Sequence, residues 1–277
     1  MLPFSYKLNK EGLVEESVYF LQGHNLAKDN NIPVYALVFA DDQALLSKTL
    51  EEATSRSALV EQIFSILEQR GYQGVNLDFE RLGAGGRDNY TKLVRELAER
   101  LNPAGYRLTI SVPAKAHDNF SWTKGYDYAA LGSSADTLII MAYDQHYSGS
   151  NPGPVAALDW VESVVQYGTS QVDSGKLLLG LGLYGYDWPE GQKARTLDLD
   201  GISKIQGAEQ SFSEKYYSPY LTYTDSAGIK HQVWYEDQQS IQGKLELVKK
   251  YQLGGYALWR LGIIPEGIWE TLRLFPN

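Results

Sequence analysis

Short apolar stretches alternate with longer amphipathic stretches along almost the whole chain. The short ones have the two-residue alternation or continuous apolar character of strands, and the longer ones have the repeat of amphipathic helices. The expected strands are 2–7, 33–39, 74–80, 108–114, 137–144, 177–184, 232–237 and 254–259. The clearest helical stretches are 57–71, 87–103, 156–168 and 239–254. This order predicts an α/β fold, a closed parallel (β/α)8 TIM barrel rather than an open doubly wound sheet.

One stretch, 189–231, lacks the helix–strand repeat. Its second half reads as two extended runs around a turn at 225–228, so we expect a small hairpin insertion after the sixth strand. Neither a low-complexity linker nor a long internal repeat is visible. The simplest organisation is therefore one barrel domain over 1–277, with the insertion inside it.

The faces of the expected strands suggest an interior that has room for a ligand. Leu177, Leu179 and Leu181 share one face of their strand, whereas Gly180 and Gly182 lie on the other. Barrel interiors are usually filled by bulky branched side chains. An interior relieved by small residues therefore favours a binding cavity.

Composition excludes several classes of function. The net charge of −9 and the pI near 5.0 argue against nucleic acid as a partner. The chain has no cysteines and therefore no disulfide frame or thiolate site. Its longest apolar run, 177–184, is too short to span a membrane. The 20 Tyr and 6 Trp residues are compatible with a cleft in which sugar rings stack on aromatic side chains.

The strand 74–80 carries the strongest chemical signal. Asn76, Asp78 and Glu80 alternate with apolar residues, so all three should point into the barrel, with Glu80 nearest the carboxyl end where barrel active sites lie. Burying two carboxylates without partners is costly. We expect an ionised Asp78 to raise the pKa of Glu80 and keep it protonated as a general acid. Two structural alternatives are an edge strand with its polar face in water and carboxylates paired with internal Arg or Lys.

Three motifs, in this order, resemble the family 18 glycoside hydrolases. They are GVNLDFE at 74–80, MAYD at 141–144 and GGYALW at 254–259. Within that family the chain is most similar to bacterial spore-cortex lytic N-acetylglucosaminidases. It departs from the general family signature at Gln73 and Asn76, where many chitinases have Asp.

The resemblance implies substrate-assisted hydrolysis with retention of configuration, in which the 2-acetamido group of the sugar is the nucleophile. Glu80 would be the catalytic acid, Asp78 would orient the acetamido group, and Tyr143 would donate to its oxygen. The resemblance implies neither a metal nor another cofactor. His117 and His146 lack a second ligand at metal-binding spacing and are expected to be surface or hydrogen-bonded residues.

Further residues are expected to bind substrate. Asn76 completes the polar column, and Trp259 offers a ring for stacking. Asp144 binds a sugar hydroxyl or, alternatively, caps a loop, whereas Tyr6 and Tyr184 are weaker candidates at strand ends. Three more weak candidates follow Tyr184 along the chain: Tyr186, Asp187 and Trp188.

The predicted substrate is an N-acetylated polysaccharide, with N-acetylglucosamine in bacterial peptidoglycan as the leading choice. A chitinase or chitooligosaccharide hydrolase using the same groups is the alternative enzyme, and a non-catalytic lectin on the same barrel is the alternative of another class. The amino-terminal stretch MLPFSYKLN does not resemble a signal peptide. The wall substrate nevertheless predicts an extracellular, spore-associated or wall-associated location.

Overall fold

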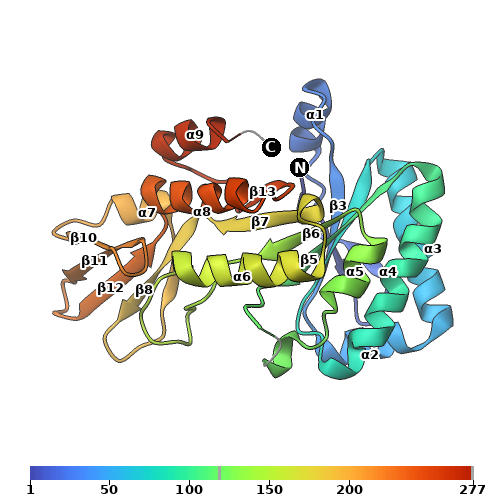
Figure 1. Ribbon diagram of the computed structural model, residues 1–277, viewed down its shortest axis with the longest axis horizontal. Coiled ribbons are helices and arrows are strands. Elements are labelled where there is room, and N and C mark those ends of the chain that lie inside the picture. Colours follow the sequence, from blue (N-terminus) through green and yellow to red (C-terminus); the bar gives the residue numbers. More distant parts are fainter. Residues whose placement is uncertain (118–119, 276–277) are drawn as a thin grey trace. The chain divides into compact units, whose positions relative to one another are not determined.

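A computed structural model of the protein describes residues 1–117 and 120–275 (Figure 1). Its internal contacts divide the chain into two compact units. Unit 1 comprises Met1–Ile140 with Gln171–Lys176, and unit 2 comprises Met141–Ser170 with Leu177–Asn277. No helix within the described residues is both long and apolar enough to cross a membrane.

Unit 1 is built on a mostly parallel sheet with the strand order β6-β5-β4-β3-β1-β2. The short β2 is antiparallel to β1, whereas β1, β3, β4 and β5 pair in parallel. Helix α3 packs against α2 and α4, which lie beside it in Figure 1. The strands are β1 (Tyr6–Leu8), β2 (Val14–Glu16), β3 (Tyr35–Ala40), β4 (Gly74–Phe79), β5 (Arg107–Pro113) and β6 (Thr137–Met141). The helices are α1 (Leu21–Asp29), α2 (Gln43–Glu51), α3 (Ala53–Arg70), α4 (Arg87–Leu101) and α5 (Tyr128–Ser134).

The core of unit 1 follows from the two repeats in the sequence. Val75, Leu77 and Phe79 occupy alternate positions of β4 and are almost fully buried. Helix α4 buries Leu93 and Leu97, four residues apart on one face. These apolar faces pack together and leave the other face of β4 for polar residues.

Unit 2 contains two separate strand arrangements. Strands β7 (Leu177–Gly182) and β13 (Gly255–Trp259) pair in parallel. A five-stranded antiparallel sheet has the order β10-β11-β12-β8-β9. Its strands are β8 (Tyr184–Pro189), β9 (Arg195–Asp198), β10 (Glu209–Ser213), β11 (Ser218–Thr224) and β12 (Lys230–Tyr235). The helices of this unit are α6 (Leu158–Gln171), α7 (Leu199–Ser203), α8 (Gln238–Lys250) and α9 (Glu266–Arg273).

The insertion is larger than the sequence suggested. The expected hairpin is present as β11 and β12, joined by the turn at 225–228, but β8, β9 and β10 extend it to five strands. The strand expected at 232–237 as part of the barrel was therefore assigned wrongly, since β12 pairs with β8 and β11 in the antiparallel sheet. Its alternating residues suit either kind of sheet, and only the pairing partners distinguish the two.

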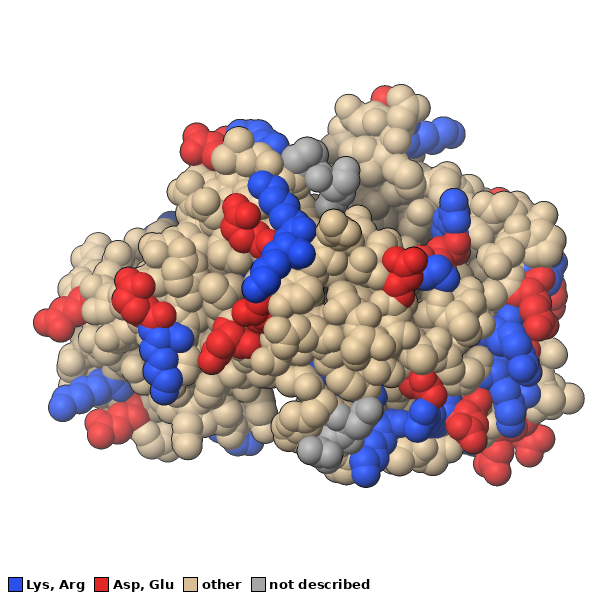
Figure 2. Space-filling view, in the orientation of Figure 1, with Lys and Arg blue, Asp and Glu red and all other residues tan. Residues whose placement is uncertain are grey.

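Acidic and basic side chains are interspersed on the face shown in Figure 2. Ion pairs in unit 1 include Arg100 with Glu61 at 2.8 Å and Arg107 with Asp136 at 2.6 Å. Exposed pairs of this kind contribute little to stability. Their effect is to balance charge locally.

Candidate active site

The acidic residues of the motif lie at the carboxyl end of β4 in unit 1. Asp78 is in the strand, and Glu80 follows its last residue. The Glu80 amide donates to the carbonyl of Ala40 at the end of β3 (2.7 Å), which continues the sheet pairing through the acid. Asp78 is in register with Phe39 of β3, so these two side chains share a face. Asp78 is 7% exposed, whereas Glu80 is partly exposed.

Asn76 is a structural residue rather than a substrate ligand. It is fully buried at 0% exposure. Its Nδ2 donates to Oγ1 of Thr109 (2.9 Å), and its Oδ1 accepts from Oγ of Ser111 (3.0 Å). Both ends of the amide are thus bound to β5. The expected contact of Asn76 with sugar is therefore wrong, and the residue joins β4 to β5. Its partners Thr109 and Ser111 are themselves buried.

The electrostatics of the pair differ from the expectation. Burial, and to a smaller extent the nearby charge of Glu80, raise the pKa of Asp78 from its ordinary 3.8 to about 7. The prediction that Asp78 is the ionised member of the pair is therefore corrected, whereas a raised pKa of Glu80 stays a prediction. Oδ1 of Asp78 is buried and lacks a hydrogen-bond partner among the described residues. Asp78 therefore retains a proton close to neutral pH and keeps one oxygen available for a ligand.

Tyr126 fixes the turn that carries Glu80, and no motif in the sequence points to this role. Its hydroxyl donates to the carbonyl of Phe79 (2.8 Å) and accepts from the amide of Leu82 (3.3 Å). Between them, Arg81 has a left-handed backbone with φ of 56°. Gly125 allows this close approach, because a Cβ there would lie 2.3 Å from the carbonyl oxygen of Leu82. One buried phenol thus holds both sides of the turn.

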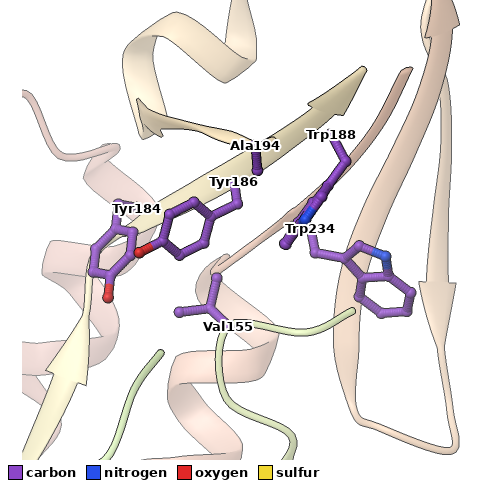
Figure 3. Close-up of a cluster of buried hydrophobic side chains, with 6 residues drawn as sticks. All are labelled: Val155, Tyr184, Tyr186, Trp188, Ala194 and Trp234. Carbon is purple, nitrogen blue, oxygen red and sulfur yellow. The ribbon is translucent and has the colours of Figure 1, made fainter. Parts of the chain in front are cut away.

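A second group of predicted residues forms an aromatic cluster around Asp144 in unit 2. Tyr184 and Tyr186 each donate a hydroxyl hydrogen bond to Oδ1 of Asp144, at 2.5 and 2.9 Å. Figure 3 shows these two tyrosines side by side on β8. Burial raises the pKa of Asp144, although the two phenol hydrogen bonds lower it. The half-buried Tyr143 packs edge to face with Tyr184, with ring centroids 6.2 Å apart.

Trp259 is the accessible aromatic residue of this group. It ends β13 and is 38% exposed. Its strand position pairs with Gly182 of β7. A Cβ at Gly182 would come within 2.8 Å of the Tyr184 ring and 3.3 Å of Tyr143. The glycine therefore leaves the space that the two tyrosines occupy, next to a tryptophan that is partly exposed.

Several weaker candidates prove to be structural. Tyr184, expected to touch substrate, is buried, and its hydroxyl holds Asp144. Asp187 is fully buried and binds Arg195 and His231. Trp188 is buried and donates its indole N–H to the carbonyl of Ser150 (3.0 Å).

Tyr6 is also a packing residue. It is in register with Val38 of β3, which is in register with Leu77 of β4, so it shares the apolar face of the sheet rather than that of Asp78. Its hydroxyl reaches that of Tyr72 at 3.4 Å. Strand-end position alone did not reveal this, because the face depends on register. His146 is hydrogen-bonded through Nδ1 to the carbonyl of Pro154 (2.9 Å), as expected.

Comparison with known proteins identifies the family of the chain. The sequence profile of glycosyl hydrolases family 18 matches residues 24–263, so the chain is a member of that family and has its TIM-barrel fold. YdhD of Bacillus subtilis, which carries the provisional name sporulation-specific glycosylase, is 38% identical over 83% of this chain. The cortical fragment-lytic enzyme of Bacillus anthracis is 29% identical over 97% of it.

The solved structure of a chitinase from Chromobacterium violaceum is also similar. It superposes with a TM-score of 0.92 at 28% identity, covering 98% of this chain and 89% of the chitinase. The chain spans 57% of the length of YdhD and 66% of that of the Bacillus anthracis enzyme. Family and fold are therefore established for this chain, and the activity is inferred below.

Proposed function

We propose that the protein hydrolyses β-linked N-acetylglucosamine in bacterial peptidoglycan, with retention of configuration. The observation that carries the proposal is the carboxyl pair at the end of β4, where a buried Asp78 with a pKa of about 7 precedes Glu80 by two residues. Two carboxyls that share a proton near neutral pH can supply both an acid and an anion. The name of the Bacillus anthracis relative supports a cortex glycan as the substrate.

In this mechanism the substrate supplies the nucleophile. The carbonyl oxygen of the 2-acetamido group attacks the anomeric carbon, while Glu80 protonates the departing glycosidic oxygen. The products of this step are a cyclic oxazolinium ion and the released sugar. Glu80, now ionised, removes a proton from water as it opens the ring, which returns the acid to its starting state and retains the anomeric configuration.

Asp78 and Tyr143 would control the acetamido group. Oδ1 of Asp78, which has no partner in the described part of the chain, can accept from the acetamido N–H, which aligns the carbonyl and stabilises the positive intermediate. As Asp78 ionises against that N–H, the proton shared by the pair becomes available to Glu80. The Tyr143 hydroxyl would donate to the acetamido oxygen, and Trp259 would stack against a sugar ring.

Two further proposals concern substrate and location. The likeness to the Chromobacterium violaceum chitinase favours a chitooligosaccharide as the second candidate substrate for the same residues. A peptidoglycan substrate implies an extracellular, spore-associated or wall-associated site of action. The lectin alternative has less support, since sugar binding alone does not require a proton-sharing carboxyl pair.

Glu80→Gln tests the proposal. The variant should lose at least about 10³-fold in kcat because glutamine cannot donate a proton, while its affinity for glycan should stay within about twofold of the parent. Parent and variant are incubated separately with cortex fragments, vegetative peptidoglycan and chitooligosaccharides, and the new reducing ends are identified by mass spectrometry. Glu99→Gln on the exposed face of α4 is the matched control and should act like the parent. Equal hydrolysis by Glu80→Gln and the parent would remove Glu80 from the acid role.

A further inference from the structure

The acid proposed above lies at the end of a strand that is paired unequally on its two sides. On the β3 side the pairing runs to Phe79, and the amide of Glu80 continues it by donating to the carbonyl of Ala40 (2.7 Å). On the β5 side the register runs from Gly74 to Leu77. Glu80 lies three residues beyond that point. Its position on this side therefore depends on contacts from elsewhere in unit 1.

Tyr126, in the segment before α5, supplies such contacts. Its hydroxyl binds the carbonyl of Phe79 at 2.8 Å and the amide of Leu82 at 3.3 Å, so one atom holds the chain on both sides of Glu80. Its ring packs edge to face with the buried Tyr90 of α4, with centroids 6.1 Å apart. The phenol is therefore fixed by packing as well as by hydrogen bonds, and it can hold the turn in one geometry.

Tyr126 is not itself suited to transfer a proton to substrate. Its one hydroxyl proton is donated to a backbone carbonyl. Burial raises its pKa above the ordinary 10, and the charges of Glu80 and Asp78 raise it as well. The phenol therefore stays neutral, although it lies within electrostatic reach of both carboxyls. Its effect on the reaction has to act through the geometry of the turn.

Lys115 holds Tyr126 from its backbone. It follows the last residue of β5 by two residues and is only 3% exposed, which is rare for lysine. Its Nζ donates to the carbonyl of Tyr126 (2.6 Å) and lies 5.3 Å from the centre of the Tyr128 ring. Burying an ammonium group is costly unless its contacts compensate. Tyr126 is thus bound to the turn through its hydroxyl and to Lys115 through its carbonyl.

The residues next to Tyr126 tie the same segment to its surroundings. The hydroxyl of Tyr128 donates to the carbonyl of Pro113, the last residue of β5. Asp127 caps the start of α5 and forms an ion pair with Arg87, the first residue of α4. Contacts from β4, β5, α4 and α5 therefore meet at the segment that carries Tyr126. Residues locked in this way by their neighbours can hold a reacting group in a productive geometry.

We propose that Tyr126 and Lys115 are positioning residues for the catalytic acid, and that they set where the Glu80 carboxyl lies when it protonates the departing oxygen. The inference rests on the proposed function, since it concerns the acid of that reaction. An acid has to lie within hydrogen-bond reach of the oxygen that it protonates, and a displacement of about 1 Å can cost roughly 100-fold in rate. Loosening the turn should therefore slow the step that needs the proton.

Two substrates that differ only in their leaving group separate acid positioning from a general loss of structure. Phenyl and 2,4-dinitrophenyl β-glycosides of the N-acetylglucosamine dimer share the same sugar. Phenolate is a poor leaving group and needs a proton from Glu80, whereas dinitrophenolate departs as the anion. The quantity to measure is kcat/KM, because it includes only the steps up to release of the phenol. The later attack of water on the oxazolinium ion therefore does not affect the comparison.

Tyr126→Phe removes the hydroxyl and keeps the ring, and Lys115→Met removes the ammonium group and keeps most of the apolar stem. For the phenyl glycoside, kcat/KM should fall about tenfold in Tyr126→Phe and about threefold in Lys115→Met. For the dinitrophenyl glycoside, both variants should stay within about twofold of the parent. Tyr72→Phe, which removes another buried phenol hydroxyl of unit 1, and Lys92→Met, on the exposed face of α4, are the matched controls. Both controls should act like the parent on both substrates.

Two results would overturn the positioning role. An equal fall in kcat/KM for both substrates would show that Tyr126 and Lys115 support only the fold, and unchanged values for both would show that the acid does not need them. A thermal melt establishes that each variant is folded. Glu80→Gln, measured beside them, should lose the phenyl glycoside and retain the dinitrophenyl one. If it does so while Tyr126→Phe acts like the parent, the positioning role fails and the proposed function stands. If Glu80→Gln hydrolyses both substrates like the parent, the proposed function fails and the positioning role with it.

Discussion

Asp78 in unit 1 and Asp144 in unit 2 each lie near the carboxyl end of a strand, but they differ in the hydrogen bonding of their carboxyl oxygens. Oδ1 of Asp144 accepts two phenol hydrogen bonds. Oδ1 of Asp78 is buried without a partner among the described residues, and the pKa of Asp78 is about 7. An unpaired buried carboxyl oxygen destabilises a fold, so its retention indicates a role in binding or chemistry. Oδ1 of Asp144, in contrast, is satisfied by two side chains of its own unit, although the residue is exposed.

Replacing each aspartate by asparagine should give the largest contrast. Asp78→Asn should lower kcat by about 10²–10³, because the amide cannot carry the negative charge that stabilises the positive intermediate. Asp144→Asn should cost about tenfold or less, since its main contacts are two tyrosines of the same unit. Steady-state kinetics on chitooligosaccharides measure both. A larger loss for Asp144→Asn than for Asp78→Asn would reverse the roles assigned to the two carboxylates.

The dependence of stability on pH should be the next largest effect. The folded-state pKa of Asp78 lies above its ordinary 3.8. Between pH 4 and pH 7 the folded protein therefore keeps a proton that the unfolded chain has released, and this carboxyl makes the fold less stable as the pH rises. For a shift of about 3 units the cost approaches 4 kcal/mol above pH 7. Asp78→Asn removes this cost. The free energy of unfolding of the variant minus that of the parent should therefore increase from pH 4 to pH 8.

Urea unfolding at pH 4, 6 and 8 measures this margin. Asp29→Asn, on the exposed end of α1, controls for the change in net charge. A margin that is constant with pH, or that shrinks as the pH rises, would show that the pKa of Asp78 is not raised in the folded protein.

The contrast between the two aspartates was only partly visible in the sequence. The alternation in 74–80 correctly placed Asn76 and Asp78 on one face, because strand periodicity is a local property. It did not show that both ends of the Asn76 amide form hydrogen bonds with β5, because the partners Thr109 and Ser111 are more than thirty residues away along the chain. Local pattern gives the face of a side chain, and long-range pairing decides whether that side chain is available.

The same limit explains the other differences. Tyr184 and Tyr186 were recognised as strand-end residues, but their common partner Asp144 lies some forty residues earlier. The strand β12 was detected and assigned to the wrong sheet, because its alternation does not specify a partner. Tyr126 had no motif at all, and only its two hydrogen bonds around Glu80 reveal its function. That the whole of 1–277 forms one domain stays a prediction.

The smallest effect should come from removing one phenol from Asp144. Tyr184→Phe deletes the donor at 2.5 Å and leaves that of Tyr186 at 2.9 Å. The hydrogen bond of Tyr184 lowers the pKa of Asp144, so the variant should raise that pKa further and lose about 1–2 kcal/mol in the free energy of unfolding. NMR titration of the Asp144 carboxyl carbon and urea unfolding measure the two effects. Tyr220→Phe, which removes a hydroxyl from the same sheet, is the matched control. Because Tyr186 still donates to Asp144, an unchanged pKa in Tyr184→Phe would show that one phenol is enough, and the assigned difference between the two aspartates would then rest on Tyr186 alone.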